Sequence, residues 1–216
     1  MSVSQLQIRR TNRAFSLLEL IVIFTIICVL LAILIPATIK ARAKAQRITC
    51  VNHLSNIGLG CRIFATDHQE LFPWQIFTNS STPMNFDMAI RNYLALSNEL
   101  STPLILRCPA DTRKAAENWV EFRRTNISYF INLDAAETYP QTILAGDRNI
   151  LTNGVHIGPG VVKLDTTTTN VAWDGGIHRF QGNVTMGDGS VQQVTLTRLR
   201  EHWTNQAQSS VTLVVP

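Results

Sequence analysis

The sequence lacks the short motifs by which the common enzyme classes are recognised. No G-x-S-x-G elbow, Walker loop, H-E-x-x-H or C-x-x-C spacing occurs in its 216 residues. Serine, histidine and aspartate are present, but not in a spacing that predicts a nucleophile, a phosphate loop or a zinc site. The sequence therefore argues against catalysis and predicts no bound cofactor.

An excess of charge is also lacking outside the first residues. Lys and Arg number 19 against 15 Asp and Glu, and Arg9, Arg10 and Arg13 all precede residue 15. Without these three arginines the balance is 16 to 15, a net charge of +1. Because long-range steering to nucleic acid needs a strong basic field, we expect no nucleic-acid partner.

Charge is almost absent from Phe15–Ile39, where Glu19 is the only charged residue. A helix of these residues is about 37 Å long, enough to cross a hydrocarbon core of about 30 Å. The arginines before it, with no acidic residue among them, place the N-terminus in the cytoplasm and the residues after Lys40 across the membrane. No A-x-A pattern follows the apolar run, which argues against a secretory signal peptide.

The run R-A-F-S-L-L-E at residues 13–19 resembles the processing site of type IV pilins and type II secretion pseudopilins. In that family a prepilin peptidase cuts before a phenylalanine, methylates the new amine and leaves a glutamate as the fifth mature residue. The resemblance implies cleavage between Ala14 and Phe15, N-methylation of Phe15, and a role for Glu19 in assembly. The family prefers glycine before the cut, and Ala14 is a tolerated replacement for it.

The glutamate has a physical use that is independent of the resemblance. An ionisable group inside a membrane helix is costly and therefore indicates function. Once cleavage frees an amine at Phe15, that cation can pair with the Glu19 carboxylate of a neighbouring helix and fix the axial register. The alternative is a plain signal anchor that tolerates a glutamate near the membrane interface.

The helical pattern continues beyond the membrane segment. Pro36 lies inside it and predicts a kink or local melting. From residue 37 to residue 67 there is no proline, and apolar residues recur at three- and four-residue steps, at Ile48, Val51, Leu54, Ile57, Cys61 and Phe64. This stripe predicts an amphipathic half-helix at residues 40–66 that packs against the domain following it.

The remaining sequence predicts a mixture of short strands and helices. Runs rich in β-branched and aromatic residues predict strands at Leu104–Asp111, Ile127–Asn132, Ile143–Asp147, Asn183–Met186 and Ser190–Val194. The Gly-Asp-Gly between the last two supplies the positive φ of a tight hairpin. Helices are expected at Asp87–Leu96 and Leu196–Thr204, loops at residues 78–83 and 154–160, and a weakly determined tail at residues 205–216.

Further motifs extend the resemblance to large pseudopilin-like families of planctomycetes and verrucomicrobia. The run C-V-N-H-L-S-N-I-G-L at residues 50–59 is similar to their C-x-N-N-L-K-Q-I-G-L, and L-R-C-P-A-D at residues 106–111 to their L-x-C-P-x-D. His178 and the pair Asp188-Gly189 stand in the H-x9-D-G relation found at the C-terminal end of those families. The resemblance therefore touches most of the chain.

A calcium site is an alternative use of Asp174 and Asp188, because some pseudopilins bind calcium in this part of the domain. The oxygen ligands are too few and too scattered to resemble an EF-hand loop. We therefore expect no metal, with Asp188 making a turn and His178 packed or hydrogen-bonded near it.

The four cysteines are Cys28, Cys50, Cys61 and Cys108. On a continuous helix Cys50 and Cys61 lie about 16 Å apart, whereas a disulfide spans roughly 4.4 to 6.8 Å between Cα atoms. In an oxidising periplasm one of these two pairs with Cys108, or both stay free and buried. The family resemblance favours Cys50 as the partner of Cys108, while Cys28 is most simply a small apolar residue of the membrane helix.

These observations predict an α+β, pilin-like protein whose long N-terminal helix packs on an antiparallel sheet of about four strands. The expected parts are a basic leader (1–14), a transmembrane assembly half-helix (15–39), the amphipathic half-helix (40–66), a globular head (67–204) and the tail (205–216).

The resemblance implies a structural, single-pass inner-membrane subunit with a periplasmic head. Its implied partners are a prepilin peptidase, other pilin or pseudopilin subunits and an inner-membrane assembly platform, and its product is a type II secretion pseudopilus or a type IV pilus-like filament. The alternative is a membrane-tethered module whose head binds a polysaccharide or a protein and never polymerises.

Overall fold

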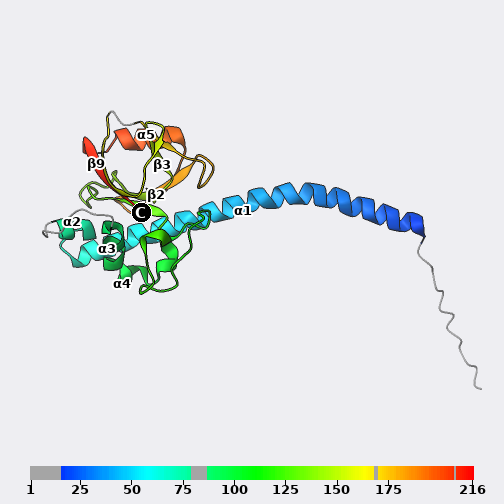
Figure 1. The fold of residues 1–216 in the computed structure, drawn as a ribbon, viewed down its shortest axis with the longest axis horizontal. Helices are drawn as coiled ribbons and strands as arrows, with labels where there is room; N and C mark the ends of the chain where they lie inside the picture. The colour runs from blue at the N-terminus through cyan, green and yellow to red at the C-terminus, as the bar shows by residue number, and fades with distance from the viewer. Residues whose placement is uncertain (1–15, 79–86, 168–169, 207) are drawn as a thin grey trace, which may run out of the picture. The chain divides into compact units, whose positions relative to one another are not determined.

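The computed structural model describes residues 16–78, 87–167, 170–206 and 208–216. The leader, the predicted cleavage residues Ala14 and Phe15, and most of the loop expected at 78–83 lie outside the described residues. The chain divides into two compact units that meet between Arg42 and Ala43. Helix α1 (Leu17–Asp67) begins in the first unit and ends in the second (Figure 1), and we call the second, Ala43–Pro216, the globular unit.

The first unit presents an apolar surface that no described residue of the chain covers. Every residue from Ser16 to Ile39 is exposed, and an 18-residue window of α1 has a mean hydropathy of 3.2 with none of it buried. By length and composition, α1 is the one helix among the described residues that is able to cross a membrane. The helix passes through Pro36 without interruption, so it does not melt there, and a kink at that residue stays a prediction.

The second half of α1 buries one stripe of side chains in the globular unit. Its buried residues recur at three- and four-residue steps, at Cys50, Leu54, Ile57, Cys61 and Phe64, with Gly58, Gly60 and Ala65 beside them. The predicted stripe is confirmed over its last four positions. It is wrong at its start, where Ile48 is 46% exposed and Cys50 is fully buried.

Two antiparallel sheets form the rest of the core. The larger has the order β5-β9-β1-β2-β7-β8, and its strands are β1 (Tyr129–Asn132), β2 (Ile143–Asp147), β5 (Gly160–Asp165), β7 (Gly182–Met186), β8 (Val191–Val194) and β9 (Ser210–Val215). The smaller has the order β4-β3-β6, with β3 (Ile150–Thr152), β4 (Val155–His156) and β6 (Val171–Trp173). The described residues thus hold nine strands, more than the four or so expected.

The other helices are short. They are α2 (Pro73–Thr78), α3 (Met88–Ala95), α4 (Ser97–Leu100) and α5 (Leu196–Thr204), with the 3₁₀ helices η1 (Pro103–Leu106) and η2 (Arg124–Asn126). α5 has the predicted bounds, and α3 lies within the predicted range.

Three expectations about local structure are wrong. Leu104–Asp111 is not a strand, because Pro103 starts η1 and the Thr102 hydroxyl accepts a hydrogen bond from the Leu104 N–H at its N-terminus. The loop expected at 154–160 contains β4. The tail expected at 205–216 contains β9, which pairs with both β5 and β1 inside the larger sheet.

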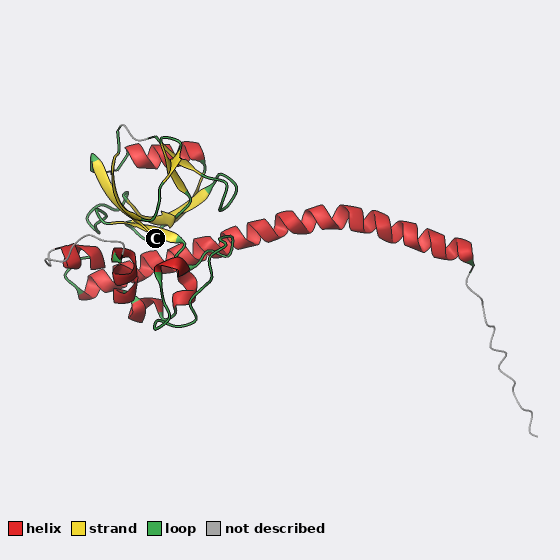
Figure 2. Cartoon of the chain, viewed as in Figure 1, coloured by secondary structure: helices red, strands yellow, loops and turns green. Residues whose placement is uncertain are grey.

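The larger sheet is covered on both faces. α1 and the short helices α2 to α4 lie on one side of it, and α5 lies on the other with the smaller sheet (Figure 2). Adjacent residues of a strand point to opposite faces, so Tyr129 and Ile131 of β1 belong to the core cluster of α1, whereas Phe130 belongs to that of α5. The central strands are therefore buried on both faces. α1 packs in one hydrophobic core, and α5 packs in a second core on the other face of the sheet.

Candidate functional site at the junction of α1 and the sheet

The β7–β8 hairpin packs its turn directly on α1. The Gly189 N–H donates to the Met186 carbonyl at 2.9 Å, and Gly189 has φ +82°, which a residue with a side chain rarely adopts. On α1, a Cβ added to Gly58 would lie 2.7 Å from the Thr185 hydroxyl oxygen and 3.2 Å from the Gly189 Cα. Arg62 donates to the Asp188 carbonyl at 2.9 Å. The Asp-Gly of the H-x9-D-G relation therefore serves as a docking turn for the helix.

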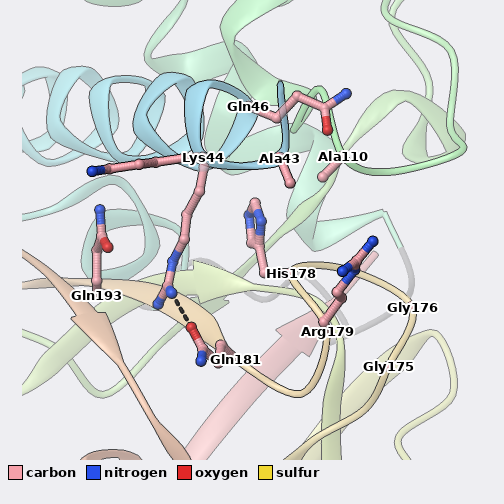
Figure 3. Close-up of a pocket in the computed structure, with 11 residues that line it drawn as sticks. Ala43, Lys44, Gln46, Ala110, Gly175, Gly176, His178, Arg179, Gln181 and Gln193 are labelled. Atoms are coloured by element: carbon pink, nitrogen blue, oxygen red, sulfur yellow. Dashed lines mark hydrogen bonds between the residues drawn. The ribbon is translucent and has the colours of Figure 1, made fainter. Parts of the chain in front are cut away.

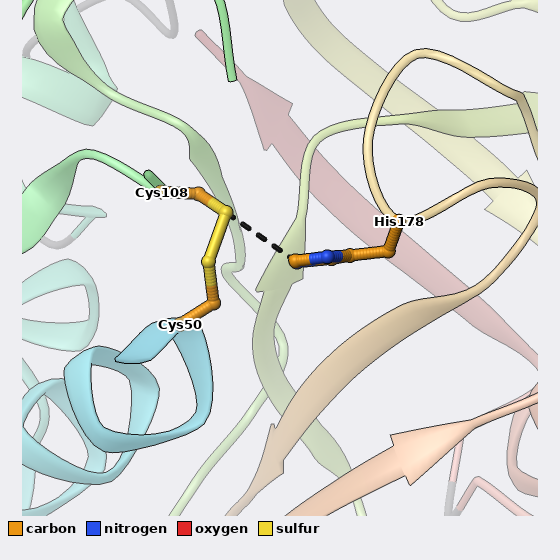
Figure 4. Close-up of side chains that lie close together, drawn as sticks. All are labelled: Cys50, Cys108 and His178. Carbon is orange, nitrogen blue, oxygen red and sulfur yellow. Dashed lines mark hydrogen bonds between the residues drawn. A yellow bond between two sulfur atoms is a disulfide. The ribbon is translucent and has the colours of Figure 1, made fainter. Parts of the chain in front are cut away.

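A disulfide joins α1 to the segment after η1. Cys50 and Cys108 are both fully buried and are bonded to each other, with their Cα atoms 5.2 Å apart. The ring of His178 lies beside this bond, with Nε2 3.4 Å from the Cys108 sulfur (Figure 4). Among the described residues, Cys28 and Cys61 are free, exposed and buried respectively.

His178 also faces a buried carboxylate. Its Nε2 lies 3.5 Å from Oδ2 of Asp147, the last residue of β2, and both side chains are almost completely buried. Asn183 donates to the same Oδ2 from its backbone N–H at 2.8 Å and from its side-chain amide at 2.9 Å. Burial raises the pKa of Asp147 to about 7, and burial, with a smaller effect of the nearby Arg47 charge, lowers the pKa of His178 to about 4.

Arg47 completes the connection back to α1. Its Nε donates to the side-chain oxygen of Asn183 at 3.3 Å, Nη2 donates to the Gly182 carbonyl at 3.2 Å, and Nη1 donates to Gln181. Burial lowers the pKa of Arg47, whereas the Asp147 charge acts in the opposite direction.

A continuous series of contacts thus links two residues of α1, Arg47 and Cys50, which are about one turn apart, through side chains of the globular unit. We call this set of residues the anchoring network: Arg47, Asn183, Asp147, His178, Cys108 and Cys50. It joins the helix to β2, to β7 and to the loop before β7. Its chemistry is that of structural attachment, because its polar groups contact one another and its sulfurs are bonded.

The loop that carries His178 has a strained backbone. His178, Arg179 and Phe180 have φ of 55°, 53° and 61°, three consecutive left-handed residues without a glycine. Such a conformation costs an ordinary residue about 1 kcal/mol or more. Gly182 follows, where a Cβ would lie 2.6 Å from the Trp173 ring, so the chain enters β7 at a position that only glycine fits.

This loop and α1 enclose an open groove of about 570 Å³ (Figure 3). The side chains that line it from α1 include Lys44, Gln46 and Arg47, and those from the loop include His178, Arg179 and Gln181. The residues that line the groove are basic, polar or small, and none is acidic.

The two aspartates of the calcium alternative each accept a hydrogen bond from a backbone N–H two residues ahead. Asp174 Oδ1 accepts from the Gly176 N–H at 2.7 Å, and Asp188 Oδ1 accepts from the Ser190 N–H at 2.8 Å, as in local turns. Within the described residues, the one group of metal-type side chains is Cys50, Cys108 and His178. Its two sulfurs are bonded to each other, so they are not thiolate ligands. His178 lies against Asp147 and the disulfide rather than beside the Asp188 carboxylate, to which no contact is recorded in the described structure.

Sequence reasoning missed the partners of these residues. Asp147 ends an otherwise apolar strand, and a charge at the end of a fully buried run is the signal that could have identified it. A second buried pair was also missed, in which Arg148 donates to both carboxylate oxygens of Asp111 at 2.7 and 2.8 Å. The guanidinium of Arg148 helps to hold the pKa of Asp111 below its usual value against the effect of burial.

Glu19 is exposed in the first turn of α1, where the helix dipole favours a negative charge. The family model that matches here is the prokaryotic N-terminal methylation motif, over residues 9–35. No curated protein and no solved structure matches the chain. The matched motif, the apolar half of α1 and the packing of its other half on an antiparallel sheet are those of a membrane-anchored, type IV pilin-like protein of the prepilin type.

Proposed function

We propose that the chain is a structural subunit of a filament. In this proposal a prepilin peptidase cuts between Ala14 and Phe15 and methylates the new Phe15 amine. The mature subunit then joins other pilin-type subunits on an inner-membrane platform, as part of a type II secretion pseudopilus or a type IV pilus-like fibre. The chain itself performs no catalysis.

The observation that carries this proposal is the contrast between the two halves of α1. The half from Leu17 to Ile39 is exposed on every side and almost entirely apolar, whereas the half from Cys50 onward is buried in the globular unit. A helix that is apolar all round requires either lipid or other apolar helices around it. The same surface therefore suits the membrane before assembly and a bundle of equivalent helices after it.

The proposed parts of the subunit are a leader at residues 1–14, an assembly half-helix at 15–39 and an amphipathic half-helix at 40–66. The head extends beyond the predicted boundary at 204, because β9 lies in the larger sheet. The leader arginines favour a cytoplasmic N-terminus, and a buried disulfide is typical of an oxidising compartment, which supports a periplasmic head.

Glu19 is the proposed determinant of register. It is the only charge between Phe15 and Ile39, and in the proposed bundle it pairs with the Phe15 amine of a neighbouring subunit. The test is intact-mass and N-terminal analysis of membrane-extracted protein from cells with and without their prepilin peptidase. We expect a peptidase-dependent chain that begins at methylated Phe15.

Assembly is tested separately with a cysteine-crosslinking series in the apolar half of α1. We expect subunit-to-subunit crosslinks in the natural sequence and their loss in Glu19→Ala, with processing retained. A control substitution, Thr25→Ala, changes another polar residue of the same half, whose hydroxyl donates only to the Val22 carbonyl of its own helix, and should retain the crosslinks. A chain that keeps its leader in peptidase-positive cells and forms no crosslinks would instead be a tethered, non-polymerising binding module.

A further inference from the structure

Two cysteines and a histidine of the anchoring network lie close enough to share one ion. The sulfurs of Cys50 and Cys108 and a ring nitrogen of His178 all lie within 4.8 Å of one another. They come from three separate segments, namely α1, the residues after η1 and the loop before β7 (Figure 4). All three side chains are buried, so an ion among them would be held away from water.

The distance between nitrogen and sulfur fits a small tetrahedral ion. Zn²⁺ lies about 2.3 Å from a thiolate sulfur and about 2.0 to 2.1 Å from a histidine nitrogen, which places these two ligand atoms roughly 3.5 Å apart. Nε2 of His178 lies 3.4 Å from the sulfur of Cys108. Two thiolates on one zinc ion lie roughly 3.8 Å apart, whereas here the sulfurs are bonded to each other. Opening this bond therefore has to separate the sulfurs, while the nitrogen is already in place.

A buried carboxylate beside the histidine favours a cation at this position. Oδ2 of Asp147 lies 3.5 Å from the same Nε2, and its other oxygen, Oδ1, is buried without a hydrogen-bond partner in the described structure. A buried polar atom without a partner is costly, and a cation held at His178 would compensate part of this cost. By contrast, Cys61 is free and buried but belongs to no such group within the described part of the chain.

We propose that Cys50, Cys108 and His178 bind one Zn²⁺ ion in the chain whose Cys50–Cys108 bond is reduced. In the reduction a dithiol gives two electrons and two protons to the disulfide and itself becomes a disulfide. The ion then displaces the two thiol protons, because the thiolate is the ligand. Thiolate and imidazole ligands favour zinc over calcium and magnesium.

The ion would join the same three segments that meet at the disulfide. Cys50 would keep α1 attached to the residues after η1 through the metal, and His178 would add the loop before β7 to the link. The attachment of α1 would then persist under reducing conditions, where the covalent bond is lost. This role goes beyond the filament function and does not depend on it.

The test uses the full chain in a neutral detergent. Because the sulfurs are buried, the chain is reduced with dithiothreitol in urea, freed of the reductant without oxygen and refolded with Zn²⁺. Affinity is measured by competition with a chromophoric chelator, and Co²⁺ in place of Zn²⁺ reports thiolate ligation through its absorption spectrum. His178→Gln removes the nitrogen ligand. The matched controls are Cys61→Ala and His156→Gln, which change one cysteine and one histidine outside the group.

Each of these variants retains Cys50 and Cys108, so the fold of each is checked by urea unfolding of its oxidised form. We expect the reduced natural chain to bind one Zn²⁺ ion, without competition from Ca²⁺, and the oxidised chain to bind none. His178→Gln should weaken zinc binding by at least about tenfold, because one of three protein ligands is lost, and the controls should change it by less than about twofold.

Four results would overturn the site. They are no zinc binding by the reduced chain, equal binding by the oxidised chain, equal affinity in folded His178→Gln, and equal affinity when the reduced natural chain is kept unfolded in urea. The last comparison separates an assembled site from binding by cysteine thiols alone, and it needs no variant. It therefore decides the question even where His178→Gln does not fold.

Discussion

The disulfide between Cys50 and Cys108 should supply a large share of the stability of the globular unit. The two residues are 58 positions apart, so the bond closes a long loop in the unfolded chain. For a loop of this length the chain-entropy relation gives about 4 kcal/mol at 25 °C. Because small domains are stable by only about 5 to 15 kcal/mol, the loss of this bond should bring the unit close to unfolding.

The perturbation is the double substitution Cys50→Ala/Cys108→Ala, which removes the bond without leaving a reactive thiol. The assay is urea unfolding of the full chain in detergent, followed by tryptophan fluorescence, since Trp74, Trp173 and Trp203 are buried in the globular unit. With a typical urea dependence for a small protein, a loss of about 4 kcal/mol lowers the midpoint by about 2 M.

The matched control is Cys61→Ala. Cys61 is a free, fully buried cysteine of the same helix, one of the stripe residues that face the same core. Its replacement removes a buried sulfur but no covalent link and should cost about 1 kcal/mol. If the double variant lost no more stability than twice this control, the cross-link would contribute nothing, and the reasoning from loop closure would be refuted.

Two further predictions concern the hairpin and the buried acid–base pair. Gly58→Ala should destabilise the globular unit by about 1 to 3 kcal/mol in urea unfolding, because the new Cβ would meet the Thr185 hydroxyl and the backbone of the β7–β8 turn. The control is Gly60→Ala, whose Cβ would meet a movable Leu100 methyl group and which should therefore destabilise the unit less. Equal losses of stability in the two variants would contradict this prediction. The second prediction concerns the pair of Asp147 and His178. The pKa of Asp147 is raised to about 7, so its contribution to the free energy of unfolding falls as pH rises; the pKa of His178 is lowered to about 4, so its contribution increases as pH rises. The two contributions therefore oppose each other between about pH 4 and 6.5. Asp147→Asn should therefore give a free energy of unfolding that rises with pH over this interval, and His178→Gln one that falls; unchanged slopes in both variants would exclude the assigned directions.

Elements with strong local signals were predictable from the sequence. β2 and α5 have the predicted bounds, because one is a compact apolar run that ends in a charge and the other has a clear helical pattern. β9 was missed although its run is rich in β-branched residues, and its place in the sheet could not be predicted from local sequence. Its run S-V-T-L-V-V becomes a strand between β5 and β1, and that pairing depends on residues about 50 and 80 positions earlier in the chain.

The side-chain contacts of the anchoring network were also only partly predictable from the sequence. The H-x9-D-G spacing drew attention to His178 and Asp188, but the partners of His178 come from β2 and from the disulfide, which spacing along the chain does not reveal. Asp188 acts through its turn and its backbone carbonyl, which contacts Arg62 of α1. Motif spacing thus located the right loops, and only the tertiary arrangement shows that both of them hold α1.

The disulfide lies at the point on α1 where separation of the helix from the sheet would begin. Cys50 is the first buried residue of α1, counted from the N-terminus, so it lies where the helix enters the core. A helix pulled by its apolar half would separate from the sheet at this end first, because no described residue of α1 before Cys50 is buried. A covalent bond at Cys50, with the Arg47 contacts one turn earlier, blocks the step at which separation would begin. In the proposed filament the apolar half is fixed among neighbouring helices, and the anchoring network is what holds the globular unit to the continuation of the same helix.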